Sequence, residues 1–114
     1  MLPCDLSITK TIQFERIKKH GKTFQAENFG VVVLKRGDKE KSKYGFIVSN
    51  KVDKGAVHRN RIKRAMREAV RQCMFNTPDG LDFLFLAKKT LLNKTTEEIM
   101  NEMKNYILNT DFTK

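Results

Sequence analysis

The sequence predicts an α/β sandwich, an α+β arrangement in which helices pack against one mixed β-sheet. Apolar residues recur at helical spacing in residues 8–20, in residues 55–75 and after residue 95. Three short runs rich in β-branched and aromatic residues lie between these segments. The order helix, strands, helix, strand, helix is typical of a sheet covered by helices. We expect residues 1–114 to form a single domain with a core large enough to fold without disulfides or a structural metal.

The first half of the chain predicts one helix and two strands. In residues 8–20, isoleucines and Phe14 interleave with basic residues, and Gly21 is a typical C-terminal stop. Residues 29–34 and 44–49 have strand composition and flank a charged stretch. We therefore expect these two strands to pair antiparallel across a charged loop.

The second half predicts a helix, a strand and a final helix. Residues 55–75 follow a helical period, residues 76–80 form a dense turn signal, and residues 81–87 are a buried strand. The helix joining two strands suggests a βαβ unit. Thr95 and Glu98 form a capping box, after which Ile99, Met103, Tyr106 and Ile107 repeat at helical spacing.

Charge is the strongest bulk signal for function. The chain has 23 Lys+Arg and 13 Asp+Glu, a formal net charge of +10. The excess is concentrated in residues 51–71, which carry 8 basic and 2 acidic residues. Such a field attracts polyanions. The basic segment offers only small aliphatic residues on its apolar side, which favours nucleic acid over a membrane surface.

The remaining bulk features indicate a cytoplasmic protein. Cys4 and Cys73 are far apart and lie in no zinc-like cluster, so we interpret both as reduced thiols. The N-terminus resembles no secretory signal, and no apolar run approaches the length of a membrane span.

The basic segment places apolar and cationic residues on opposite sides of one helix. At about 100° per residue, the apolar side holds Ile62, Ala65, Met66, Ala69, Val70 and Cys73. The other side holds Asn60, Lys63, Arg64, Arg67 and Arg71, with Arg61 at its margin. A mixed Lys/Glu face would be interpreted as merely solvated, but here only Glu68 interrupts the positive charge. Arginine can bind a phosphate with two hydrogen bonds or stack on a base, so the arginine bias favours recognition of a ligand over bare solubility.

The same residues resemble a known family. Lys51, the run from Lys54 to His58, and then Arg59-Asn60-Arg61-Ile62-Lys63-Arg64 with Arg67 look like the Arg-Asn-Arg signature of the bacterial ribonuclease P protein. The resemblance implies an αβββαβα domain, ribosomal protein S5 domain 2-like, whose βαβ crossover is left-handed. The general preference for right-handed crossovers would have predicted the opposite hand.

The resemblance also implies a function, the removal of the 5′ leader from precursor tRNA to give the mature 5′ end. In that family the signature helix binds a catalytic RNA, which performs the phosphodiester hydrolysis with Mg²⁺. The protein is then the subunit of a ribonucleoprotein endoribonuclease, with no catalytic residue and no cofactor or metal of its own. The residues expected to bind the RNA subunit are Lys51, Arg59, Asn60, Arg61, Lys63, Arg64, Arg67 and Arg71.

A second site implied by the resemblance is a cleft between the first helix and the sheet, which holds the single-stranded leader. Phe14 matches an aromatic position there, with Lys10 and Arg16 as basic candidates. Stacking on an aromatic ring tolerates any base, but Phe14 could equally be a core residue. Many family members have a second aromatic residue where this chain has Lys18, so leader binding here is expected to depend more on charge.

Rival functions leave weaker signals. His20, expected at a helix end, and His58, expected in a loop, lack clustered partners. Asp53, Glu68, Asp79 and Asp82 form no evident carboxylate cluster of the kind that two-metal nucleases use. General RNA binding and autonomous nuclease activity remain the alternatives. A DNA-reading helix-turn-helix fits less well because strands flank the basic helix, so neither DNA nor membrane is an expected partner.

Overall fold

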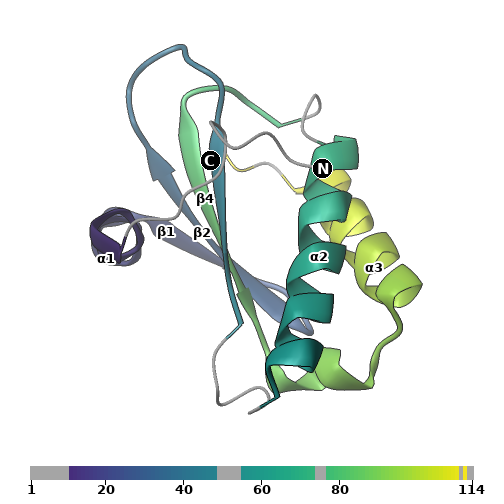
Figure 1. The fold of residues 1–114 in the computed structure, drawn as a ribbon. Coiled ribbons are helices and arrows are strands. Elements are labelled where there is room, and N and C mark those ends of the chain that lie inside the picture. Colours follow the sequence, from purple (N-terminus) through teal and green to yellow (C-terminus); the bar gives the residue numbers. More distant parts are fainter. Residues whose placement is uncertain (1–10, 49–54, 74–76, 111, 113–114) are drawn as a thin grey trace.

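A four-stranded mixed sheet separates one helix from two others (Figure 1). This computed structural model describes residues 11–48, 55–73, 77–110 and 112. The elements in chain order are α1 (Thr11–His20), β1 (Lys22–Gln25), β2 (Phe29–Lys35), β3 (Lys43–Ile47), α2 (Ala56–Cys73), β4 (Leu81–Ala87), the 3₁₀ helix η3 (Lys89–Asn93) and α3 (Thr96–Asn109). The order confirms the predicted αβββαβα arrangement, to which the structure adds η3.

The sheet order is β1-β2-β4-β3, so the expected antiparallel pairing of the second and third strands was wrong. β4 lies between β2 and β3, antiparallel to the first and parallel to the second. Its sequence fits a central position, because Phe83 and Phe85 point to one face and Leu84 to the other, and all three are buried. The loop from residue 36 to residue 42 connects β2 to β3 across the end of β4.

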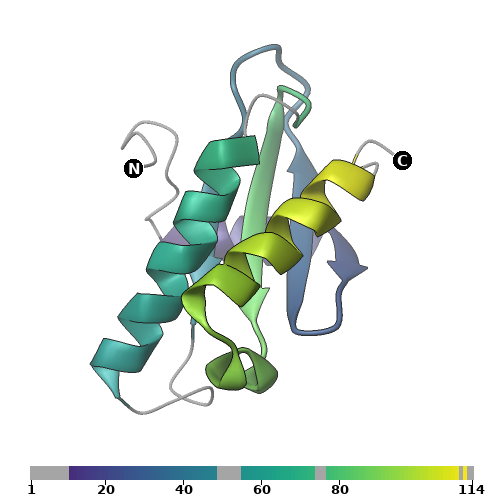
Figure 2. The ribbon, with the colours of Figure 1, turned by 90° about the vertical axis from the view of Figure 1, so that its right-hand side faces the viewer.

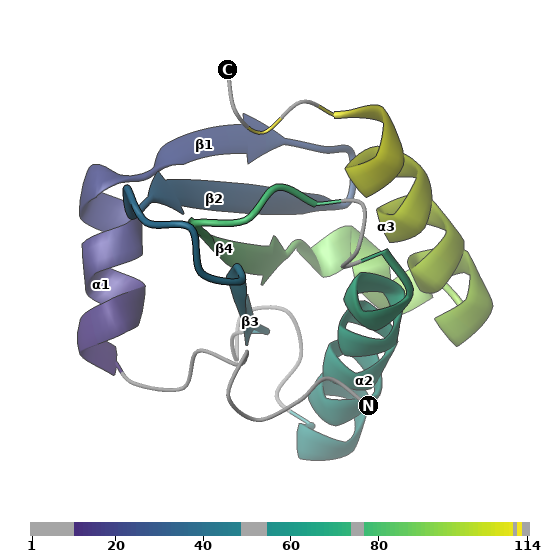
Figure 3. The same ribbon diagram turned by 90° about the horizontal axis from the view of Figure 1, so that it is seen from above.

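The crossover from β3 through α2 to β4 has the left-handed sense that the family resemblance implies. α2 and α3 cover one face of the sheet, and α1 lies alone on the other (Figures 1 and 3). Seen from the α2 side with the parallel strands pointing up, β4 lies to the left of β3 (Figures 2 and 3). A right-handed unit would place β4 on the other side.

Two apolar clusters occupy the two faces of the sheet. The larger joins α2 and α3 to the sheet, and the buried residues of α2 are the six that the helical period predicts. The smaller cluster contains Ile17, Val32, Leu34 and Leu84, with Phe14, Ile47 and Leu86 partly buried against it. α1 is therefore held by few side chains, and part of the sheet beside it stays accessible.

Arg36 ties the loop between β2 and β3 together. Its guanidinium donates to the carbonyl oxygens of Glu40 and Lys41 at 3.2 and 2.8 Å and lies 3.3 Å from a carboxylate oxygen of Asp38. Gly80, with φ of 80°, donates its N–H to the Glu40 carbonyl at 2.7 Å. A Cβ at this glycine would lie 2.3 Å from the Asp38 carbonyl oxygen, so a larger residue would force the two loops apart.

Candidate nucleic-acid interface

The polar side of α2 is accessible along its first three turns. Asn60, Arg64 and Arg67 are exposed and Lys63 is half-buried. The guanidinium of Arg67 lies 6.0 Å from the centre of the Phe46 ring, which turns this side chain toward β3. The predicted row of cations therefore faces solvent beside the β3 edge of the sheet, while the opposite side of α2 is buried in the core.

Most of this row lacks a carboxylate partner. Among the residues that the structure describes, Lys63, Arg64 and Arg67 form no ion pair. We call these three residues with Asn60 the α2 cation row. Mutual repulsion makes such a row unfavourable for the free helix, and a polyanion bound to it would relieve that cost.

Arg71, which the helical period also places on this side, has a different environment. Its Nε donates to both oxygens of Glu68 at 3.0 Å, and Gln72 donates to Glu68 at 3.2 Å. These hydrogen bonds lower the pKa of Glu68 to about 2. Lys104 of α3 donates to Gln72 at 2.9 Å, so the end of α2 is engaged with α3. The unpaired part of the row thus ends at Arg67.

The two arginines of the signature are partly buried. Arg61 donates from Nη1 to the backbone carbonyl of Lys94 at 3.1 Å, at the end of η3. Arg59 is half-buried in the first turn of α2, and its Nε has no hydrogen-bond partner within the described part of the chain. Lys51 lies outside the described residues. Arg61 therefore has a structural contact in addition to any RNA contact.

Three of the four predicted leader residues lie on α1. Phe14 is half-buried against the smaller apolar cluster, a position between a core residue and a free aromatic surface. Arg16 and Lys18 are exposed, and Lys10 lies outside the described residues. The sequence pattern had left the core and site interpretations of Phe14 equal, and its partial burial is compatible with both.

Further residues join this surface without having been predicted. Ile47 of β3 and Leu86 of β4 are partly exposed on the same sheet face as Phe14. Lys43 precedes Ile47 on that face, and it pairs in register with Asp82. Strand alternation could have placed these residues on one face, but the wrong pairing of β2 with β3 concealed their proximity. We call the surface bounded by Phe14, Ile47 and Leu86 the α1 cleft, after the leader site that the family resemblance implies.

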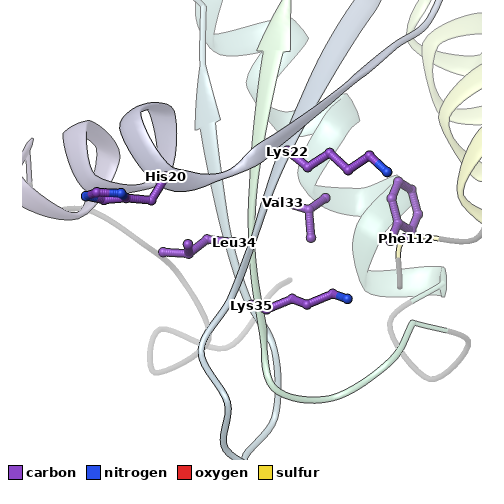
Figure 4. Close-up of a pocket in the computed structure, with 6 residues that line it drawn as sticks. All are labelled: His20, Lys22, Val33, Leu34, Lys35 and Phe112. Carbon is purple, nitrogen blue, oxygen red and sulfur yellow. The ribbon is translucent and has the colours of Figure 1, made fainter. Parts of the chain in front are cut away.

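A separate cavity of about 270 Å³ lies at the end of α1 (Figure 4). It is lined by His20, Lys22, Val33, Leu34, Lys35 and Phe112. Lys22 and Lys35 extend toward Phe112, whereas His20 lies on the other side of the strand (Figure 4). His20 is six residues beyond Phe14, about 9 Å along a helix, so this cavity is distinct from the α1 cleft.

Within the described residues, no three His, Cys, Asp or Glu side chains gather in a way that could hold a metal ion. His58 is an exposed residue of α2, not a loop residue as expected, because the helix begins at Ala56. Cys73 is a free, buried thiol. None of the described helices is both long and apolar enough to cross a membrane.

Comparison with known protein families and sequences tests the family resemblance directly. The profile of the family described as Ribonuclease P matches residues 2–111. The chain belongs to the ribonuclease P protein family. It is 36% identical over 102 residues to the ribonuclease P protein component of Clostridium kluyveri, covering 88% of this chain and 89% of the relative. It is 32% identical over 105 residues to that of Clostridioides difficile, covering 91% and 90%.

Comparison with solved structures supports the same family membership. The RNase P protein of Staphylococcus aureus superposes with a TM-score of 0.80 at 29% identity, covering 88% of this chain and 90% of that one. Membership of the ribonuclease P family places the chain in tRNA processing, as an RNA-binding component of a ribonucleoprotein endoribonuclease.

Proposed function

We propose that this chain binds the catalytic RNA subunit of ribonuclease P through α2 and the 5′ leader of precursor tRNA in the α1 cleft. By holding both RNAs, it assists endonucleolytic removal of the leader. The observation that carries this proposal is the α2 cation row, whose three cations lack carboxylate partners in the described structure. A folded RNA supplies the phosphates that such a row requires.

The α1 cleft suits a single-stranded leader. Phe14 offers a partly exposed ring, and stacking of a base on an aromatic side chain contributes roughly 1–3 kcal/mol whatever the base. Arg16 and Lys18 add charge from the same helix. A leader that differs between tRNAs needs contacts of this sequence-tolerant kind.

The chemistry is assigned to the RNA subunit and its Mg²⁺ ions. In this proposal the protein offers no catalytic residue and binds no cofactor by itself. It lowers the repulsion between two polyanions and orients the leader beside the metal ions of the ribozyme. We expect the complex to act in the cytoplasm.

Reconstitution tests the function as a whole. The purified chain alone is expected to leave precursor tRNA intact, and addition of the cognate RNA subunit should give 5′ cleavage at a lower Mg²⁺ concentration than the RNA needs by itself. Cleavage by the protein alone would make it a nuclease. Binding to many RNAs without any effect on cleavage would leave only a general RNA-binding role.

Matched variants separate the two surfaces. Arg59→Ala and Arg64→Ala should weaken assembly with the RNA subunit, whereas Lys89→Ala, which removes an exposed charge from η3, should not. Phe14→Ala should weaken the binding of precursor tRNA more than that of mature tRNA. Ile12→Ala is its control, because Ile12 is an apolar α1 residue with 79% of its surface exposed. Equal losses for both tRNAs in the Phe14 variant would contradict leader binding in the α1 cleft.

A further inference from the structure

The guanidinium of Arg67 contacts an aromatic ring of the sheet. It lies 6.0 Å from the centre of the Phe46 ring, within the range of a cation–π contact. Phe46 is on β3, at one end of the strand order β1-β2-β4-β3, so its ring is not enclosed between two strands. Among the described residues, Lys63 and Arg64 have no contact of this kind. Arg67 is therefore the cation of the α2 cation row that the sheet holds in place.

Phe46 itself belongs to a group of four stacked rings. Phe85 is its partner in the parallel β3–β4 register, and the two ring centroids are 5.4 Å apart with the planes inclined by 13°. Phe85 stacks on Phe83, and Phe83 stacks on Tyr44. Phe46 is 8% exposed, whereas the other three rings are 0–2% exposed, so Phe46 is the accessible member of the group. A ring packed in this way offers a fixed surface to a cation.

The contact with the ring leaves the hydrogen-bonding groups of Arg67 available. A guanidinium has five N–H donors in its plane, and a cation–π contact uses its charge and not these donors. Arg67 is exposed and forms no ion pair within the described part of the chain. Arg71 differs, because its Nε and Nη2 donate to Glu68. An RNA can therefore bind the N–H groups of Arg67 while the ring contact persists.

Holding Arg67 in place before RNA binds lowers the entropy lost on binding. A free arginine side chain samples many rotamers, and fixing it in a complex costs conformational entropy. Part of this cost is already met in the free protein where the Phe46 ring restricts Arg67. Arg64 is exposed and has no ring to restrict it among the described residues, so it bears the full cost.

We propose that Phe46 is a positioning residue, which holds Arg67 in the orientation in which its guanidinium binds a phosphate of the RNA subunit. In the complex, the ring contact persists and the N–H donors of Arg67 face the phosphate. The inference rests on the proposed function, since it adds a residue of the apolar core to the interface between α2 and the RNA subunit. Phe46 acts through Arg67.

Phe46→Leu in the reconstituted enzyme tests the proposal. Leucine keeps the site apolar and removes the ring. Affinity for the RNA subunit should fall about two- to fivefold, the effect of one exposed cation–π contact. The dependence of log K on log salt concentration should keep its slope, because Arg67 keeps its charge. Arg67→Ala should lower the affinity and also reduce the magnitude of that slope by about 1. Wild-type affinity in Phe46→Leu would overturn the proposal.

Double variants distinguish positioning from folding. In the Arg67→Ala background, Phe46→Leu should cause no further loss of affinity, whereas in the Arg64→Ala background it should cause its full loss. Phe83→Leu is the matched control, because it removes a buried ring of the same group that does not stack on Phe46. At a temperature where circular dichroism shows each variant to be folded, Phe83→Leu should bind the RNA subunit like the wild type. Equal losses from Phe46→Leu with and without Arg67 would show that the ring acts through the fold, and the proposal would fail.

Proton NMR of the free wild-type protein provides a test that needs no variant. The aromatic ring should shift the side-chain signals of Arg67 upfield relative to those of Arg64. Equal shifts for the two arginines would contradict the ring contact and with it the positioning role.

The Arg67→Ala variant keeps this inference separate from the proposed function. If Arg67→Ala weakens assembly and Phe46→Leu does not, α2 binds the RNA subunit but Phe46 does not position Arg67. If neither Arg64→Ala nor Arg67→Ala weakens assembly, the RNA subunit binds elsewhere and both proposals fail.

Discussion

Arg64 and Arg71 carry the same charge on the same helix, yet their surroundings differ. Arg64 is exposed and has no ion pair among the described residues, whereas Arg71 donates to the Glu68 carboxylate from both Nε and Nη2. Each phosphate contact releases counterions when the RNA subunit binds. Arg64→Ala should therefore reduce, by about 1, the magnitude of the slope of log K against log salt concentration, where K is the association constant for the RNA subunit. Arg71→Ala should change this slope less, because its charge is already compensated. Titrations at several salt concentrations measure both slopes.

Glu68→Gln provides the control for that difference. Removing the carboxylate frees Arg71, so in the Glu68→Gln background Arg71→Ala should change the slope about as much as Arg64→Ala does. Equal slopes for the two alanine variants in the wild-type background would show that Glu68 does not withhold Arg71 from the RNA.

At the scale of elements, α3 depends on its first turn. The Thr95 hydroxyl accepts from the Glu98 N–H at 3.1 Å, and the Glu98 carboxylate accepts from the Thr95 N–H at 3.0 Å. Thr95→Ala should therefore lower the free energy of unfolding by about 1 kcal/mol. Thr95→Ser keeps the hydroxyl and should retain most of this stabilisation. Urea unfolding measures both. These bonds lower the pKa of Glu98, so its contribution should be lost as the pH falls through that lowered pKa. An unchanged midpoint in Thr95→Ala would contradict the role of the cap.

Local chemistry made α3, the buried stripe of α2 and the strand at residues 81–87 predictable from the sequence. Helical spacing and capping residues act over one or two turns, and each of these elements lies where they indicate. β1 is short, with three of its four residues exposed, so it carries no pattern to detect. Strand alternation shows which residues share a face but not which strands are neighbours, and β2 was therefore paired with the wrong strand. The proximity of Ile47 to Leu86 on one sheet face needs the correct strand order, so strand alternation alone could not reveal it.

At the scale of the whole molecule, the sheet separates the two proposed RNA surfaces. α1 and α2 lie on opposite faces of the sheet (Figures 1 and 3). Phe14 belongs to the smaller apolar cluster, and the buried side of α2 to the larger one. The central strand β4 contributes to both clusters, but alternate residues face opposite sides. Among the described residues, the two surfaces thus share a scaffold but lie on its opposite faces.

This separation predicts additivity. Residues that share no partners usually have additive effects, to within about 0.3–0.5 kcal/mol. We therefore expect additivity in the free energy of assembly of the chain with its RNA subunit and precursor tRNA. The double variant Phe14→Ala/Arg64→Ala should change this free energy by the sum of the changes in the two single variants. Filter binding of the reconstituted complexes measures this double-mutant cycle. A large coupling energy between Phe14 and Arg64 would show that the two surfaces communicate through the sheet or through the bound RNA.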